Sequence, residues 1–320
     1  MRESIKFDKL KIITKEKYIS YINPEAFIKN ESCGRISSWT YDCSSPFSLR
    51  IEKNRKRNEL IIEFTGKILL EDYPKLIGID NIILCLKNIN NLGVCKLDVD
   101  SILRDSYVTK CDVTVDVPYT QLKELTTRII ENINNHKKYV YKKTDDNLEI
   151  TNCLKTKNLK TRLIIYDKER EMRMPKNGVF LKSTSNSNEI LNHFKNKVRF
   201  ELNLNSMELI RRYLGIKNTE LISVLKSTNN PIMDFFNKIL INVKNMPTGI
   251  RSLRDYERYM LLKGCHFNLP EVETIVRKYI SPTASVKRSM EPYHNLLHSC
   301  KEETVGVLDE LKKILTGSCL

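Results

Sequence analysis

Short segments in which polar and apolar residues alternate set the strongest limit on how this chain can fold. Residues 110–117 (KCDVTVDV) alternate strictly until Pro118 ends the run, and residues 197–204 (KVRFELNL) repeat the pattern. Residues 160–167 (KTRLIIYD) are also typical of a strand. Successive side chains of a strand point to opposite faces, so these segments predict a sheet with one apolar and one polar face.

Helical patterns surround and follow these strands. Residues 120–134 predict an amphipathic helix, whereas residues 80–89 fit a short helix or a strand equally well. Beyond residue 206 the patterns are helical, and the first such helix is predicted to stop at Gly215. The sequence therefore predicts an α+β fold with a mainly antiparallel central sheet and flanking helices, followed by a smaller helical region.

We expect a domain boundary near residue 215. Residues 1–215 would form the domain that carries any chemistry, and residues 216–320 a helical C-terminal domain that binds DNA or a protein partner. The chain has 320 residues, which is enough for a catalytic domain and a smaller one.

Charge and cysteine usage narrow the class of function. A formal net charge of +15 implies a polyanionic partner such as nucleic acid, although charge alone does not separate DNA from RNA or from an anionic membrane. Nine cysteines without close pairs indicate free thiols in a reducing compartment. No apolar run approaches the ~20 residues of a membrane span, so we expect a cytoplasmic protein, in a bacterial host, that does not enter the membrane.

Three segments in a fixed order carry a resemblance to a known family: KCDVTVDVP, TRLIIYDKERE and NKVRFELNLNSMELIRRYLG. They resemble the gene II/X family of phage and plasmid replication initiators, of which the filamentous-phage proteins are typical, and IIEFTGKILL is a weaker fourth match. The pattern is also similar to that of rolling-circle plasmid initiators, with Asp-x-x-x-Asp, Arg-x-Tyr-x-Lys and Arg-x-Glu strands. The resemblance covers residues 55–215 in separate blocks.

The resemblance implies a rolling-circle replication initiator, a metal-dependent endonuclease and strand transferase. Such proteins nick one strand at an origin and rejoin it through a 5′-phosphotyrosine, and the matching strand places that role on Tyr166. A phenol of ordinary pKa near 10 needs nearby cations to ionise, and we expect Lys168 and Arg162 on the same strand face to supply them. The alternative is that Tyr166 is a half-buried packing residue, as strand tyrosines usually are.

The metal site is expected to consist of carboxylates, because the His-hydrophobic-His motif of the wider nickase superfamily is absent from this sequence. Hard oxygen ligands favour Mg²⁺ or Mn²⁺. The candidate ligands share a place on the polar face of a predicted strand: Glu63, Asp112, Asp116 and Glu201. The alternative is that these acids form the solvated face of a one-sided sheet.

DNA is the expected partner, as a replication origin in single-stranded and supercoiled duplex forms, and a host helicase is a further candidate. Arg199 could clamp a phosphate or pair with a neighbouring carboxylate, and the sequence does not separate the two. Other basic residues are expected to contact the phosphate backbone of DNA: Arg55, Lys56, Arg57, Lys157 and Lys160. Two other functions fit the charge: a basic replication or partition factor that binds DNA without cutting it, and an RNA-binding protein.

Overall fold

A computed structural model describes residues 4–32, 35–133, 138–153, 160–240, 250–281, 284–299 and 306–316. The contacts within the chain divide it into two compact units. The first unit is Met1–Ile241 together with Leu311–Leu320, and the second is Asn242–Glu310.

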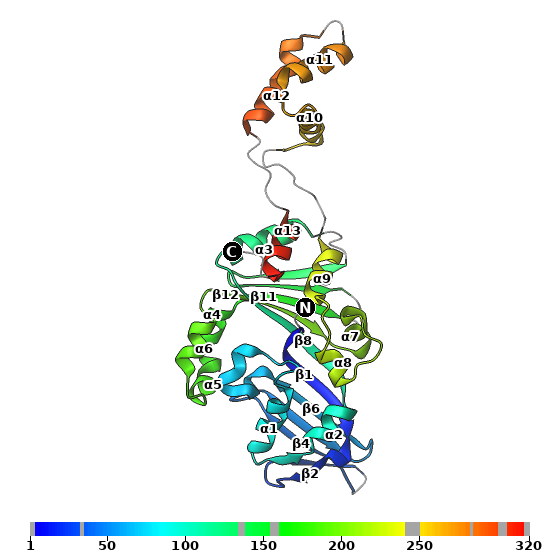
Figure 1. The fold of residues 1–320 in the computed structure, drawn as a ribbon, viewed down its shortest axis with the longest axis vertical. Helices are drawn as coiled ribbons and strands as arrows, with labels where there is room; N and C mark the ends of the chain where they lie inside the picture. The colour runs from blue at the N-terminus through cyan, green and yellow to red at the C-terminus, as the bar shows by residue number, and fades with distance from the viewer. Residues whose placement is uncertain are drawn as a thin grey trace. The chain divides into compact units, whose positions relative to one another are not determined.

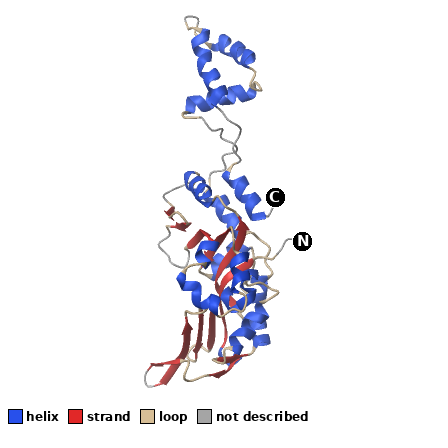
Figure 2. Ribbon diagram, turned by 90° about the vertical axis from the view of Figure 1, so that its left-hand side faces the viewer, coloured by secondary structure: helices blue, strands red, loops and turns tan. Residues whose placement is uncertain are grey.

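A single 10-stranded sheet forms the frame of the first unit (Figure 1, Figure 2). All neighbouring strands in it are antiparallel, which confirms the predicted fold class. In spatial order the strands are β3 (Ile28–Ser32), β4 (Arg35–Cys43), β5 (Leu49–Asn54), β6 (Glu59–Thr65), β1 (Lys6–Lys15), β8 (Tyr107–Pro118), β12 (Lys197–Leu204), β11 (Thr161–Asp167), β10 (Asn147–Asn152) and β9 (Tyr139–Lys143). Strands β2 (Ile19–Ile22) and β7 (Cys95–Leu97) form a separate pair.

The three segments that the alternation predicts as strands lie side by side at the centre of the sheet. They form β8, β12 and β11, with β12 in the middle. On one face, apolar side chains such as Val113, Phe200 and Ile165 are buried. Helices α7 (Met207–Leu214) and α9 (Pro231–Ile239) pack against β12. We call this the helix-covered face, and it contains the core of the unit.

Helices account for most of the remaining chain. In the first unit they are α1 (Ile82–Asn91), α2 (Val99–Asp105), α3 (Leu122–Glu131), α4 (Lys168–Met172), α5 (Gly178–Lys182), α6 (Ser187–His193), α7 (Met207–Leu214), α8 (Leu221–Leu225) and α9 (Pro231–Ile239). Short 3₁₀ segments are η1 (Glu16–Tyr18), η2 (Gly66–Lys75) and η4 (Pro175–Asn177). The undecided segment at residues 80–89 is helical, because Ile82, Cys85, Leu86 and Ile89 bury one face of α1 at helical spacing.

The first unit continues beyond residue 215, where the sequence places the domain boundary. Helix α7 does end at Gly215, whose φ of 65° is the left-handed conformation that glycine adopts without strain. The chain then returns to the sheet, where Phe235 and Phe236 of α9 are fully buried. The rings of Phe236 and Phe200 on β12 are 6.2 Å apart, so α9 packs within the core of this unit.

The second unit is helical, as the sequence predicts for the C-terminal part. It contains α10 (Leu253–Gly264), α11 (Leu269–Tyr279) and α12 (Val286–Ser299), and α13 (Val307–Thr316) follows. Its small core contains Leu262, Val272 and Met290. Within the ranges given above, no helix has the length and apolar character that crossing a bilayer requires.

Candidate active site

The face of the central sheet opposite to the helix-covered face is lined with polar side chains, and we call it the polar face. The pairing register places Arg199 opposite Asp116 and Asn203 opposite Asp112 across β12 and β8. On the other side of β12, Tyr166 of β11 lies opposite Arg199. Three strands that lie far apart in the sequence thus bring five of the predicted site residues onto one surface: Asp112, Asp116, Tyr166, Arg199 and Glu201.

Tyr166 is positioned by a direct contact to Glu201. Its hydroxyl donates a hydrogen bond to Glu201 Oε2 at 3.2 Å. Burial raises the pKa of Tyr166 well above its ordinary value of 10; the charge of Arg199 lowers it, and that of Glu201 raises it again. Burial therefore favours the protonated phenol, which donates to the Glu201 carboxyl.

Asp112 and Glu201 lie diagonally across β8 and β12, since Glu201 pairs with Thr114 and Asp112 pairs with Asn203. Burial and the charge of Glu201 raise the pKa of Asp112 to about 7. Burial, followed by the charge of Asp8, raises the pKa of Glu201. The Asn203 amide donates to Glu201 Oε1 at 3.3 Å. These two carboxyls are held close together without enough positive charge to keep both ionised.

A hollow of about 260 Å³ contains both carboxyls and is surrounded by basic side chains. Its basic lining residues are Lys9, Lys11, Lys110 and Arg162. Glu63 also lines it, but Lys9 Nζ at 2.6 Å and Lys11 Nζ at 3.4 Å pair with its carboxylate. Burial alone would raise the pKa of Glu63, and these two lysines lower it instead. Glu63 thus shares the hollow with Asp112 and Glu201, yet its charge is already compensated.

A second hollow of about 290 Å³ shares Glu201 with the first. Tyr166 and Glu201 line it together with Arg170 and Lys176. Glu201 belongs to both hollows, so it lies between the carboxyl of Asp112 and the phenol of Tyr166. A phosphate that occupied this junction would reach both groups.

Arg199 is fully buried and pairs with carboxylates, which is the second of the two roles that the sequence left open. Its Nε and Nη2 donate to the two oxygens of Asp116 at 2.6 and 2.7 Å, and its Nη1 donates to Asp8 Oδ1 at 2.7 Å. Burial would raise the pKa of Asp116, but the charge of Arg199 lowers it. Asp116 is therefore engaged with Arg199 and is not grouped with Asp112 and Glu201.

The sequence predicts Lys168 on the same strand as Tyr166, and this prediction is wrong. Strand β11 ends at Asp167, one residue before Lys168. The Asp167 side chain accepts a hydrogen bond from Arg170 N and caps α4, of which Lys168 is the first residue. The Lys168 ammonium is buried, with Glu171 Oε2 at 2.7 Å and Tyr73 Oη at 2.9 Å. It lies 5.8 Å from the ring centre of Tyr166. Burial and the charge of Arg199 lower the pKa of Lys168.

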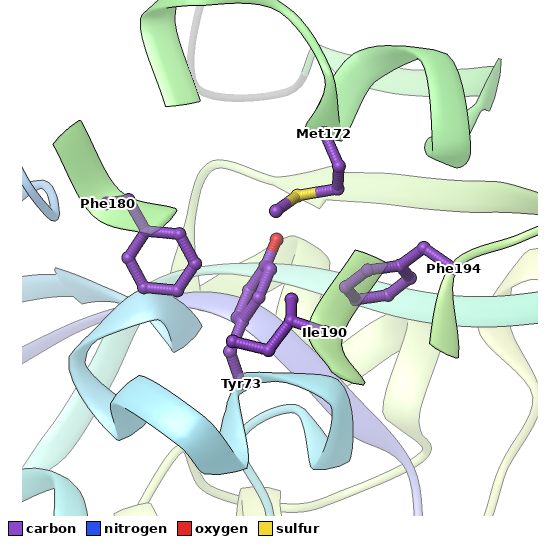
Figure 3. Close-up of a cluster of buried hydrophobic side chains, with 5 residues drawn as sticks. All are labelled: Tyr73, Met172, Phe180, Ile190 and Phe194. Atoms are coloured by element: carbon purple, nitrogen blue, oxygen red, sulfur yellow. The ribbon is translucent and has the colours of Figure 1, made fainter. Parts of the chain in front are cut away.

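Tyr73 of η2 connects the two buried cations. Its hydroxyl contacts both Lys168 and, at 3.0 Å, Arg199 Nη1. Figure 3 shows its ring within an apolar cluster that includes Met172, Phe180 and Phe194. This cluster covers one end of the polar face and fixes the positions of Arg199 and Lys168 beside Tyr166.

The other predicted DNA contacts lie away from this junction. Arg55, Lys56 and Arg57 are exposed in the turn between β5 and β6. Lys160 is half-buried next to β11, and Lys157 lies outside the described residues. Arg162, which the sequence predicts as a cation near Tyr166, lines the first hollow 3.6 Å from Glu149, near the opposite end of β11 from Tyr166.

The sequence did not single out Asp8, Lys9, Lys11, Tyr73 or Glu171. A bulge in β1 between Phe7 and Lys9 interrupts the alternation that would have marked Asp8 and Lys9 as neighbours on one face. A signal was present in the remainder of β1, where Lys9 and Lys11 alternate with buried Leu10 and Ile12. Tyr73 and Glu171 lie outside strands and carry no such signal.

No group of three or more His, Cys, Asp or Glu side chains among the described residues is arranged to hold a metal ion. Among the described acids that line the first hollow, Glu63 pairs with lysines, whereas Asp112 and Glu201 form no ion pair with a described residue and are the candidate donors. This set fits Mg²⁺, which proteins commonly hold through one or two carboxylates, with water and substrate phosphate as the other ligands.

Residues 82–222 match a phage family whose description is the N-terminal part of a replication-associated protein. The match spans β8, β11 and β12, and with them Asp112, Tyr166 and Glu201. Searches of curated proteins and of solved structures found no match. The family match supports a phage replication initiator, and therefore a role in phage DNA replication that involves binding DNA.

Proposed function

We propose that this protein initiates rolling-circle replication as an origin-specific endonuclease and strand transferase, with Tyr166 as the nucleophile. The observation that carries the proposal is the hydrogen bond from the Tyr166 hydroxyl to Glu201. Glu201 lines both the first and the second hollow, and basic side chains surround the first. A nuclease of this kind needs a nucleophile, an acceptor for its proton and positive charge for the phosphate. On the polar face, the candidates for these three tasks are Tyr166, Glu201 and the basic side chains around the first hollow.

In the nicking step, Glu201 accepts the phenolic proton as the Tyr166 oxygen attacks a backbone phosphorus. The bond between phosphorus and Tyr166 Oη forms, and the bond between phosphorus and the 3′ oxygen breaks. The 3′ oxygen takes a proton from water as it leaves, while Glu201 keeps the phenolic proton, so the products are a 3′ hydroxyl and a 5′ phosphate on Tyr166. No high-energy cofactor is consumed, because one phosphodiester replaces another.

Rejoining is the same step in reverse. A 3′ hydroxyl attacks the phosphotyrosine and gives its proton to water, and the phenol leaves and recovers its proton from Glu201. Buried Arg199 and Lys168 place positive charge near Tyr166 without being exposed to the strand, so they stabilise the phenolate as it forms and as it leaves. Their charges act within a low-dielectric region, where they are less screened than at the surface.

Asp112 and Glu201 would hold Mg²⁺ or Mn²⁺. The ion would polarise the scissile phosphate and neutralise negative charge in the transition state. Lys9, Lys11, Lys110 and Arg162 around the hollow would bind the phosphates on either side of the scissile one. The basic residues around the first hollow would therefore bind the DNA strand, whereas Asp112 and Glu201 would take part in the reaction.

Nicking of a supercoiled plasmid that carries this protein's own gene tests the proposal. We expect Mg²⁺ to convert the plasmid to open circles, EDTA to prevent this, and Tyr166→Phe to abolish it. Tyr141→Phe is a matched control, because Tyr141 is an exposed tyrosine on the edge strand β9. If Tyr166→Phe nicks as fast as the wild type, the assignment of the nucleophile is wrong. If the protein binds DNA without cutting it, a non-catalytic replication or partition factor takes its place.

A further inference from the structure

A third hollow, of about 420 Å³, lies away from the polar face. Its lining includes the basic residues Lys138, Arg212 and Lys238 and the tyrosines Tyr139 and Tyr213. None of the described residues that line it is Asp or Glu. The hollow therefore has the composition of an anion site and differs from the acidic hollow around Asp112.

The three cations line the same hollow, and Lys238 is near enough to Arg212 for their charges to interact. Within the described residues, Lys138, Arg212 and Lys238 form no ion pair. Burial and then the charge of Arg212 lower the pKa of Lys238, while Asp234, one helical turn earlier on α9, partly offsets them. The Lys238 ammonium lies 4.1 Å from the ring centre of Tyr213. An anion at this position would relieve the repulsion between Lys238 and Arg212.

The location separates this hollow from Tyr166. Tyr213 lines the hollow together with Thr161, whose buried side chain alternates with Arg162 and so lies on the helix-covered side of β11. Thr161 and Tyr166 are also at opposite ends of that strand, about 17 Å apart at about 3.4 Å per residue. A ligand in this hollow would not compete with a phosphate at the Tyr166 junction.

We propose that this hollow is a second binding site for single-stranded DNA, in which Arg212, Lys238 and Lys138 bind backbone phosphate. Half-buried Tyr139 beside these cations offers a ring on which an unpaired base can stack. A duplex keeps its base faces inside the helix and could use only the charges. The proposal depends on the proposed function only in taking DNA as the ligand, and it requires no nicking.

Cys153 provides a direct probe, because this exposed thiol lines the hollow. The full-length protein in EDTA is treated with N-ethylmaleimide, with and without an oligothymidylate, and labelling of each cysteine is followed by peptide mass spectrometry. At an oligonucleotide concentration about ten times its dissociation constant, we expect labelling of Cys153 to slow by about tenfold. Half-buried Cys43 on β4 lies outside the hollow and serves as the internal control, with an unchanged rate.

The double variant Arg212→Ala/Lys238→Ala should lose the protection of Cys153, and its DNA affinity should depend less on salt, by a slope change of about 1 to 2. Lys217→Ala/Lys226→Ala is the matched control, since both lysines are exposed and outside the hollow. Equal protection by inorganic phosphate, better protection by oligouridylate, or none by oligothymidylate would overturn the proposal. Labelling is measured in EDTA and does not require nicking, so the two proposals can fail separately. If DNA protects Cys153 but the protein never nicks a plasmid, the proposed function is refuted and the second binding site still holds.

Discussion

Replacing Asp112 by Asn should stabilise the metal-free protein while it abolishes nicking. The substitution keeps the shape of the side chain and removes one of two carboxyls that repel each other on the polar face. Burial and Glu201 raise the pKa of Asp112 from 3.8 to about 7 in the folded protein. The ionised form of Asp112 is therefore less stable in the folded chain than in the unfolded chain.

The magnitude follows from this shift. The rise in the pKa of Asp112 from 3.8 to about 7 corresponds to a loss of folding stability of at most about 4 kcal/mol at high pH. Solvent reaches the half-buried carboxyl, and screening reduces this to about 1 to 2 kcal/mol. The raised pKa contributes stability that is fully present below about pH 4 and is lost as the pH rises through about 7. The advantage of Asp112→Asn should thus be absent at about pH 4 and complete at about pH 8.

Thermal unfolding in EDTA measures this effect, and we expect the midpoint of Asp112→Asn at about pH 8 to exceed that of the wild type by about 2 to 8 °C. Mg²⁺ should raise the midpoint of the wild type and leave that of the variant unchanged. Asp145→Asn is the matched control, because the Asp145 side chain is 86% exposed and its loss should change little. An Asp112→Asn protein that is less stable at this alkaline pH than the wild type, or equal stabilisation of both by Mg²⁺, would refute the reasoning.

Three further outcomes follow from the same contacts. Arg199→Met should lower the free energy of unfolding by about 3 to 5 kcal/mol in urea titrations, because it leaves two carboxylates without their buried partner, and a loss below about 1 kcal/mol would contradict this. Phe236→Ala should cost about 3 to 5 kcal/mol in the same assay if α9 belongs to the core, whereas a peripheral α9 would tolerate it. Alanine at Arg55, Lys56 and Arg57 should reduce the salt dependence of DNA affinity by up to about 3 in slope, and an unchanged slope would remove this turn from the interface.

The sequence predicted the central strands because their alternation is local. In residues 110–117 of β8 and 197–204 of β12, neighbouring residues differ in polarity, so the buried face could be identified without knowledge of the neighbouring strands. The same rule could not decide whether Arg199 faces solvent or a carboxylate. That depends on Asp8 and Tyr73, which reach Arg199 from parts of the chain more than 120 residues away.

The placement of Lys168 and of α9 could not be predicted, because both depend on contacts that the local alternation of residues does not show. Lys168 follows Tyr166 with strand spacing, but the capping contact of Asp167 starts a helix there and turns the ammonium into a buried pocket. The segment that contains α9 was assigned to a separate helical domain because nothing in its own sequence shows which core receives Phe235 and Phe236. Local patterns define elements, whereas the partners of each element depend on the complete fold.

Identifying the residue that carries the DNA tests the central claim most directly. The protein is incubated with Mg²⁺ and a single-stranded origin oligonucleotide that cannot be rejoined once its 3′ segment has diffused away, and the covalent product is digested with protease and nuclease. We expect mass spectrometry to find a nucleotide phosphate on Tyr166, in the peptide that contains LIIYDK, and none when Glu201 is replaced by Gln. A nucleotide on another residue, or cleavage that leaves no covalent product, would contradict the mechanism.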